Sequence, residues 1–167
     1  TGSTIVIRPN QVAQDADGNT PYADKRLGQA FAMAVDNALC LELGYAGKGS
    51  PADNSHAGPM HPEYDPSVVR LPYDPEKAMA LMKEAGMEEY EHEITSIDDD
   101  WRKNTTDSVA AQLRDAGFKV KRTILPGSTP LGTRMVWGDF TLVSAPQCSN
   151  PTIFLESTYK ILWGYID

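Results

Sequence analysis

The loop at residues 54–61 holds the side chains that come closest to a metal-binding set. His56, Met60 and His61 offer two imidazoles and a thioether, which suit a soft transition metal. Their spacing follows no regular element, and no cysteine or second carboxylate cluster adjoins them. Because most loop histidines are simply solvated, we expect no metal at this loop.

An acidic run between Glu84 and Asp100 is the second set of chemically active groups. A calcium site would need carboxylates at alternating loop positions around a turn-forming glycine, and this pattern is missing. The run therefore predicts a solvated face, and its last three aspartates predict the start of a helix, where the dipole favours negative charge.

Catalytic motifs are missing from the sequence: there is no nucleophile elbow, phosphate-binding loop or dinucleotide fingerprint. Gly44, Gly47 and Gly49 differ from the dinucleotide motif in order and follow a helical pattern. One alternative is a small α/β enzyme that uses the 54–61 loop, although no Ser/His/Asp or Cys/His arrangement supports it. Another is a protein-interaction module that uses the apolar tail at residues 163–167.

The composition is that of an ordinary globular chain of 167 residues, with 41% hydrophobic and 23% charged residues. A net charge of −8 argues against nucleic acid or anionic lipid as a partner. No apolar run reaches the length of a membrane span, and no signal peptide opens the sequence. Cys40 and Cys148 lie far apart, and we expect two free thiols, although the sequence leaves their pairing open.

Hydrophobic periodicity predicts alternating strands and helices. Strands are expected at residues 4–8, 90–97, 118–124 and 140–143, and helices at residues 24–43, 74–85, 98–116 and from 151 onward. The two helix–glycine–strand passages, at Gly86 and Gly117, favour a crossover between parallel strands. Between residues 45 and 72 no periodicity survives, which is typical either of a functional loop or of an ordered surface wrap.

The apolar positions of these segments predict a core. It comprises Ile5, Ile7, Phe31, Val35, Leu81, Val109, Leu113, Val120 and Leu142. Trp101 lies on the inner stripe of the 98–116 helix, so core packing is expected for it as well.

Residues 73–86, YDPEKAMALMKEAG, carry start and stop signals for a helix: Asp74 can cap it, Pro75 suits its first turn and Gly86 its end. The same segment resembles a signature of the peptide-type (dipeptide, oligopeptide, nickel) solute-binding proteins of ABC importers. Residues 21–36, PYADKRLGQAFAMAVD, are similar to that family's PFxDxxVRQAxxxAxD segment. Residues 111–120 resemble its helix-to-strand passage, and the resemblance extends from about Thr4 to Leu155.

This resemblance implies an α/β fold with a mixed sheet flanked by helices, as in lobe II of a type II periplasmic-binding protein. Family members are several times longer, so residues 1–167 resemble a single excised second lobe, whose first and last segments, at Thr4 and near Ile153, should lie close together. It implies a periplasmic or extracytoplasmic receptor without catalysis or a cofactor. The expected partners are a peptide or similar small ligand, the first lobe and the transporter permease, with no nucleic acid and no direct membrane insertion.

The resemblance also places the ligand-binding residues. In relatives, the strand matching residues 140–143 leads into GWxxDYxxP, whose carboxylate pairs with the α-amino group of the ligand. Here Gln147 takes the position of the Trp and no acidic residue remains, and Gly28 replaces a usual Arg. We therefore expect neutral hydrogen-bonding contacts to the ligand. The residues expected in the site are Trp137, Ser144, Gln147, Cys148, Ser149 and Asn150.

Overall fold

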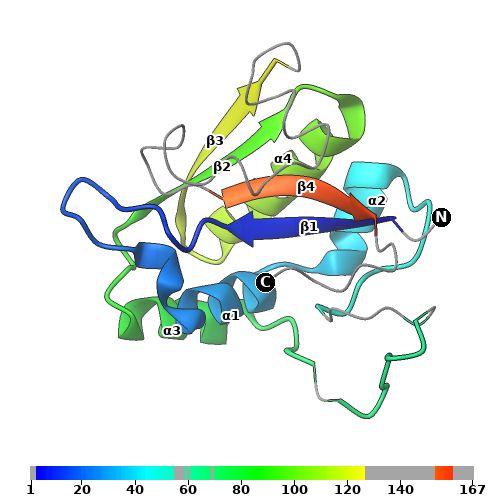
Figure 1. The fold of residues 1–167 in the computed structure, drawn as a ribbon, viewed down its shortest axis with the longest axis horizontal. Coiled ribbons are helices and arrows are strands. Elements are labelled where there is room, and N and C mark those ends of the chain that lie inside the picture. Colours follow the sequence, from blue (N-terminus) through cyan, green and yellow to red (C-terminus); the bar gives the residue numbers. More distant parts are fainter. Residues whose placement is uncertain (1–2, 55–58, 60, 69, 127–152, 160–167) are drawn as a thin grey trace.

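The computed structural model describes residues 3–54, 59, 61–68, 70–126 and 153–159 (Figure 1). The described elements, in chain order, are strand β1 (Ser3–Pro9), the 3-10 helix η1 (Pro21–Ala23), helices α1 (Lys25–Ala34), α2 (Asn37–Tyr45) and α3 (Pro75–Glu84), strand β2 (Glu91–Ile97), helix α4 (Asp100–Asp115), and strands β3 (Lys119–Leu125) and β4 (Ile153–Tyr159).

The four described strands form one mixed sheet in the order β1-β4-β2-β3. Strand β2 pairs in parallel with β3 and with β4, whereas β1 pairs antiparallel with β4. The predicted crossover is confirmed, because α4 joins the parallel neighbours β2 and β3. The predicted closeness of the first strand to Ile153 is also confirmed, since Ile153 pairs with Pro9 and Thr4 pairs with Thr158.

The helix predicted from residue 151 onward is wrong, because Ile153–Tyr159 is strand β4. Its isoleucine, phenylalanine, threonine and tyrosine are residues that favour strands. The strand also finds backbone partners on both sides, in β1 and in β2. These partners come from distant parts of the chain, so the helical spacing of a few apolar residues was misleading. The strand predicted at residues 140–143 lies outside the described residues.

The single helix predicted at residues 24–43 is in fact two helices. Val35 is extended, with φ −116° and ψ 123°, and Asp36 begins a new helix by accepting bonds from the Ala38 and Leu39 amides. The Asp36 amide itself donates to Gln112 Oε1 at 2.7 Å, so a side chain of α4 fixes the break.

The left-handed residue that ends α2 is Ala46, with φ 52°. Gly44 lies inside α2 at its contact with α4. A Cβ atom there would lie 2.2 Å from Thr105 Oγ1, so only glycine lets the two helices approach this closely.

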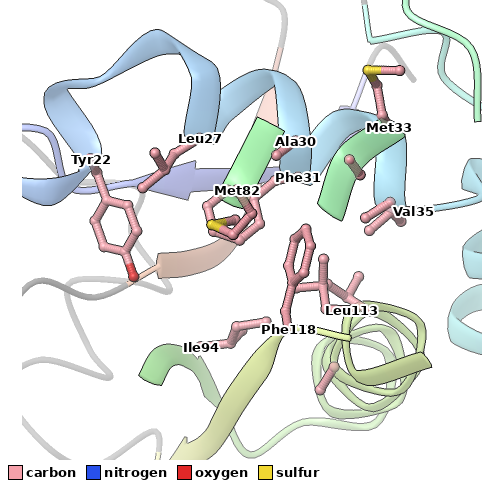
Figure 2. Packing of buried hydrophobic residues seen from close by; sticks show 14 residues of the cluster. Tyr22, Leu27, Ala30, Phe31, Met33, Val35, Met82, Ile94, Leu113 and Phe118 are labelled. Carbon is pink, nitrogen blue, oxygen red and sulfur yellow. The ribbon is translucent and has the colours of Figure 1, made fainter. Parts of the chain in front are cut away.

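One hydrophobic core lies between the sheet and its helices, with α1 packed on α3 and α2 on α4. Figure 2 shows Phe31 and Met82 facing Phe118, Leu113 and Ile94 across this core. Of the predicted core residues, four are buried: Phe31, Val35, Val109 and Leu113. Four are partly buried against the core: Ile5, Ile7, Leu81 and Val120. Leu142 lies outside the described residues.

Candidate functional site

The residues predicted to bind the ligand lie outside the part of the chain that the structure describes. They are Trp137, Ser144, Gln147, Cys148, Ser149 and Asn150. Their described neighbours are placed: Pro126 follows β3, and Ile153 begins β4 beside Ile94 of β2. The segment between them therefore joins two strands that flank β2.

The carboxyl ends of β2 and β3 meet at one edge of the sheet, where α4 also begins. Ile97 and Leu125 pair at this edge, and the Asp98 amide donates to the Leu125 carbonyl at 2.8 Å. Asp99 then caps α4 by accepting a bond from the Arg102 amide at 3.0 Å. Ligands of open α/β sheets bind outside the carboxyl ends of parallel strands. The β2–α4 junction is therefore the best-placed candidate site among the described residues.

Two buried polar side chains at this junction each have one atom without a hydrogen-bond partner among the described residues. Ser96 is completely buried and its Oγ is unpartnered, and Arg102 is 8% exposed with an unpartnered Nε. The Arg102 guanidinium forms an ion pair with Asp99 and lies 4.0 Å from the centroid of the Trp101 ring. A buried polar atom without a partner is costly, so bonds from a ligand or an adjoining segment would stabilise both groups.

The junction combines buried donors with negative charge. Asp98 and Asp100 are exposed, and Asp99 is partly covered by its bonds to Arg102. Ser96 has no histidine or carboxylate in hydrogen-bond contact among the described residues, so it lacks the base that activates a serine nucleophile. The arrangement is thus suited to holding a polar ligand rather than to attacking it.

Sequence reasoning missed Ser96 and Arg102 and misjudged Trp101. Trp101 is only half-buried beneath the Arg102 guanidinium, so the predicted core packing is wrong. One signal was present: Ser96 lies at the end of a predicted strand, just before an acidic helix start, which is where parallel sheets bind ligands.

The described part of the long loop at residues 45–72 wraps over the junction of α1 and α2. Asn37 Nδ2 donates to the Ala52 carbonyl at 2.7 Å and to Asn54 Oδ1 at 3.0 Å. Arg70 Nε donates to Asp53 Oδ2 at 3.1 Å. A shallow hollow of about 280 Å³ lies between this loop and the helices. Of the two interpretations left open by the sequence, these contacts favour an ordered surface wrap.

The remaining candidates for metal or redox chemistry that the structure describes are Cys40 and His61. Cys40 is a free thiol; burial raises its pKa, and Gln112 Nε2 donates to its Sγ at 3.2 Å. His56 and Met60 lie outside the described residues, whereas His61 is described. Within the described ranges, no group of three or more His, Cys, Asp or Glu side chains could hold a metal ion.

The sequence of nearly the whole chain matches a known family. Residues 1–158 match the family described as bacterial extracellular solute-binding proteins, family 5 middle. The chain belongs to this family. This confirms the resemblance to peptide-type solute-binding proteins of ABC importers.

Curated relatives of this solute-binding family match a part of the chain. Di/tripeptide-binding protein 2 of Pseudomonas aeruginosa is 39% identical over 87 residues, which are 50% of this chain and 16% of that protein. Heme-binding protein A of Haemophilus influenzae is 38% identical over 69 residues, 40% of this chain and 12% of that protein. The chain thus corresponds to a small share of the length of these relatives.

Solved structures of solute-binding proteins share the fold. AgaA of A. tumefaciens R10, in complex with agropinic acid, matches with a TM-score of 0.71 at 20% identity, over 95% of this chain and 29% of that chain. NikA from Brucella suis, in complex with Fe(III)-EDTA, matches with a TM-score of 0.68 at 21% identity, over 93% of this chain and 30% of that chain. The predicted mixed α/β fold of type II periplasmic-binding proteins is confirmed. No helix in the described ranges has the length and apolar character needed to cross a bilayer.

Proposed function

We propose that this chain is the second, ligand-binding lobe of an extracytoplasmic solute receptor that delivers a peptide or a similar small solute to an ABC importer. The observation that carries this proposal, beyond the family match, is the pair of buried polar atoms at the β2–α4 junction, Ser96 Oγ and Arg102 Nε, which have no partner among the described residues. The proposed partners are the first lobe of the same receptor and the transporter permease. No step of the proposed function is catalytic.

In this proposal the ligand acts by closing two lobes over itself. A ligand can shift a hinge equilibrium only through contacts that exist in the closed state and not in the open one. Ser96 and Arg102 would supply such contacts from this lobe, because Ser96 Oγ and Arg102 Nε have no partner in the part of the chain that the structure describes. A lobe alone offers about half of these contacts, whereas the entropic cost of association, roughly 4 kcal/mol or more, is undiminished.

The loop of residues 144–150 is proposed to complete the site from the segment that leads into β4. Ser144, Gln147, Ser149 and Asn150 offer neutral groups, each worth roughly 0.5–1.5 kcal/mol, against about 1.5–3 kcal/mol for bonds to charged groups. The preferred ligand should therefore lack a free α-amino group at this end, or have that group held by the other lobe.

Substitution at the β2–α4 junction tests the proposal in a receptor that carries both lobes. A mixture of di- and tripeptides is first screened by thermal shift, and the best peptide is titrated calorimetrically into Ser96→Ala and Arg102→Gln. Each change should weaken binding by roughly tenfold, because each removes a contact worth about 1–3 kcal/mol. Ser67→Ala, in an exposed turn, and Arg114→Gln, at the far end of α4, are the matched controls.

The outcome that contradicts the proposed site is equally clear. If Ser96→Ala and Arg102→Gln bind the peptide as tightly as the two controls do, the junction is not part of the ligand site. If no di- or tripeptide shifts the melting temperature of the two-lobed receptor, the peptide class itself is wrong.

A further inference from the structure

His92 lies in the amino half of β2 with no exposed surface. Four aromatic rings surround its imidazole. The ring centroids of Phe31 and Tyr90 are 5.2 Å away, that of Tyr22 is 5.8 Å away and that of Phe118 is 6.2 Å away. These rings come from η1, from α1 and from the residues just before β2 and β3. His92 is therefore the point where the strand meets several other segments.

The polar atoms of His92 fit only a neutral ring. Nδ1 lies 3.1 Å from the Tyr22 hydroxyl oxygen, whereas Nε2 has no hydrogen-bond partner among the described residues. A neutral imidazole has one N–H and one acceptor nitrogen, but an imidazolium has two N–H donors and a positive charge. In the charged form, whichever tautomer preceded it, Nε2–H would be an unpaired donor in a site without water contact.

Among the described residues, no negative charge offsets the burial of His92. The titratable ones are two phenols, Tyr22 of η1 and Tyr90 before β2, and burial raises the pKa of both. The nearby carboxylates Glu93 and Asp15 act on these phenols and raise their pKa further. The segments α1 and the start of β3 contribute phenyl rings. Within this cluster, His92 is thus the group whose charge changes between pH 7 and pH 4.

We propose that His92 is an acid-sensitive latch, which holds η1 and α1 on the sheet while its ring is neutral and releases them when it takes up a proton. Burial lowers the pKa of His92 from 6.5 to about 4. Because the unfolded chain takes up this proton at a higher pH than the folded chain, the stabilisation is complete above pH 6.5 and is lost as the pH falls toward about 4. Through this window the folding equilibrium constant should fall by up to about tenfold per pH unit, and on the order of 100-fold in total.

Urea unfolding of the 167-residue chain at several pH values between 7 and 4.5 tests the latch. Wild type is compared with His92→Phe, which keeps an aromatic ring in the cluster, and with His61→Gln as the control. His61→Gln also removes one histidine from the unfolded chain, but from a half-buried loop position outside this cluster. As the pH falls, the folding equilibrium constants of wild type and His61→Gln should fall in parallel. The fall in this constant should be smaller for His92→Phe, by a factor on the order of 100.

A second measurement needs no substitution and decides the question if His92→Phe does not fold. In the wild-type chain, an NMR titration should show the assigned His92 ring protons unchanged between pH 7 and pH 5. Titration of His92 above pH 6 would overturn the proposal, as would a His92→Phe variant that keeps the wild-type pH dependence.

Discussion

Strand β2 carries two buried polar side chains on one face, and their surroundings differ. His92 and Ser96 are both completely buried, and each has one polar atom without a partner among the described residues. His92 is enclosed by four aromatic rings in the amino half of the strand. Ser96 lies near the carboxyl end of β2, just before α4, which begins with the Asp99 cap and its bond to the Arg102 amide.

The comparison teaches that an unsatisfied buried atom does not by itself mark a ligand site. At His92 the enclosing rings leave Nε2 without a partner among the described residues, and the proposed consequence is a pH-dependent stability. Ser96 lies where the parallel strands end and charged groups begin, which is the edge at which open α/β sheets bind ligands. Position relative to the strand ends decides between the two roles.

The largest effect is expected when the aromatic cluster is opened. Phe31→Ala should lower the free energy of unfolding by about 3–5 kcal/mol, because it removes a buried ring and leaves a cavity. Water entering the cavity should also raise the pKa of His92 toward its ordinary value. Urea unfolding and an NMR titration check both effects. A destabilised variant with an unchanged His92 titration would show that burial by these rings does not hold the imidazole neutral.

A smaller effect is expected at the start of α4, which frames the carboxyl edge. Asp99→Ala should cost about 1 kcal/mol of stability, because it removes the cap of the Arg102 amide and the ion pair that covers the guanidinium. Asp100→Ala is the control, since Asp100 is exposed and does not cap the helix. Equal stabilities of the two variants in urea unfolding would contradict the assigned cap.

The smallest effect is expected for the helix glycine that departs from the family pattern. A Cβ atom at Gly28 would meet nothing within 4 Å, so Gly28→Ala should stabilise α1 by up to about 1 kcal/mol. Gly44→Ala is the opposite case, because its Cβ would collide with Thr105. Compared with wild type, thermal unfolding should show a higher midpoint for Gly28→Ala and a lower midpoint for Gly44→Ala. A lower midpoint for Gly28→Ala would contradict the open space around Gly28.

Elements whose ends are set by neighbouring residues could be predicted from the sequence. Helix α3 has its cap, proline and glycine within the segment itself: Asp74 accepts a bond from the Lys77 amide, and Gly86 has φ 70°. The crossover from β2 through α4 to β3 follows from the same local signals. The break at Val35 could not be predicted, since Gln112, from a helix far along the chain, holds the Asp36 amide.

The candidate site was harder to predict than the fold. A serine at the end of a strand is common, and only the folded chain shows that the Ser96 hydroxyl is buried without a partner. The family resemblance directed attention instead to residues 144–150, which lie outside the described residues and stay a prediction. Strand β4, which follows these residues, pairs its backbone with β1 and β2. Both partners come from distant parts of the sequence, so no local pattern reveals them.

Calorimetry on the chain with and without a first lobe tests most directly the claim that it is one half of a receptor. Di- and tripeptides are titrated into the 167-residue chain alone and into a receptor that carries both lobes. We predict no measurable heat with the single lobe and binding at micromolar concentration or tighter with the two-lobed receptor, because only closure buries the ligand from both sides. Micromolar binding to the 167-residue chain alone would contradict the account.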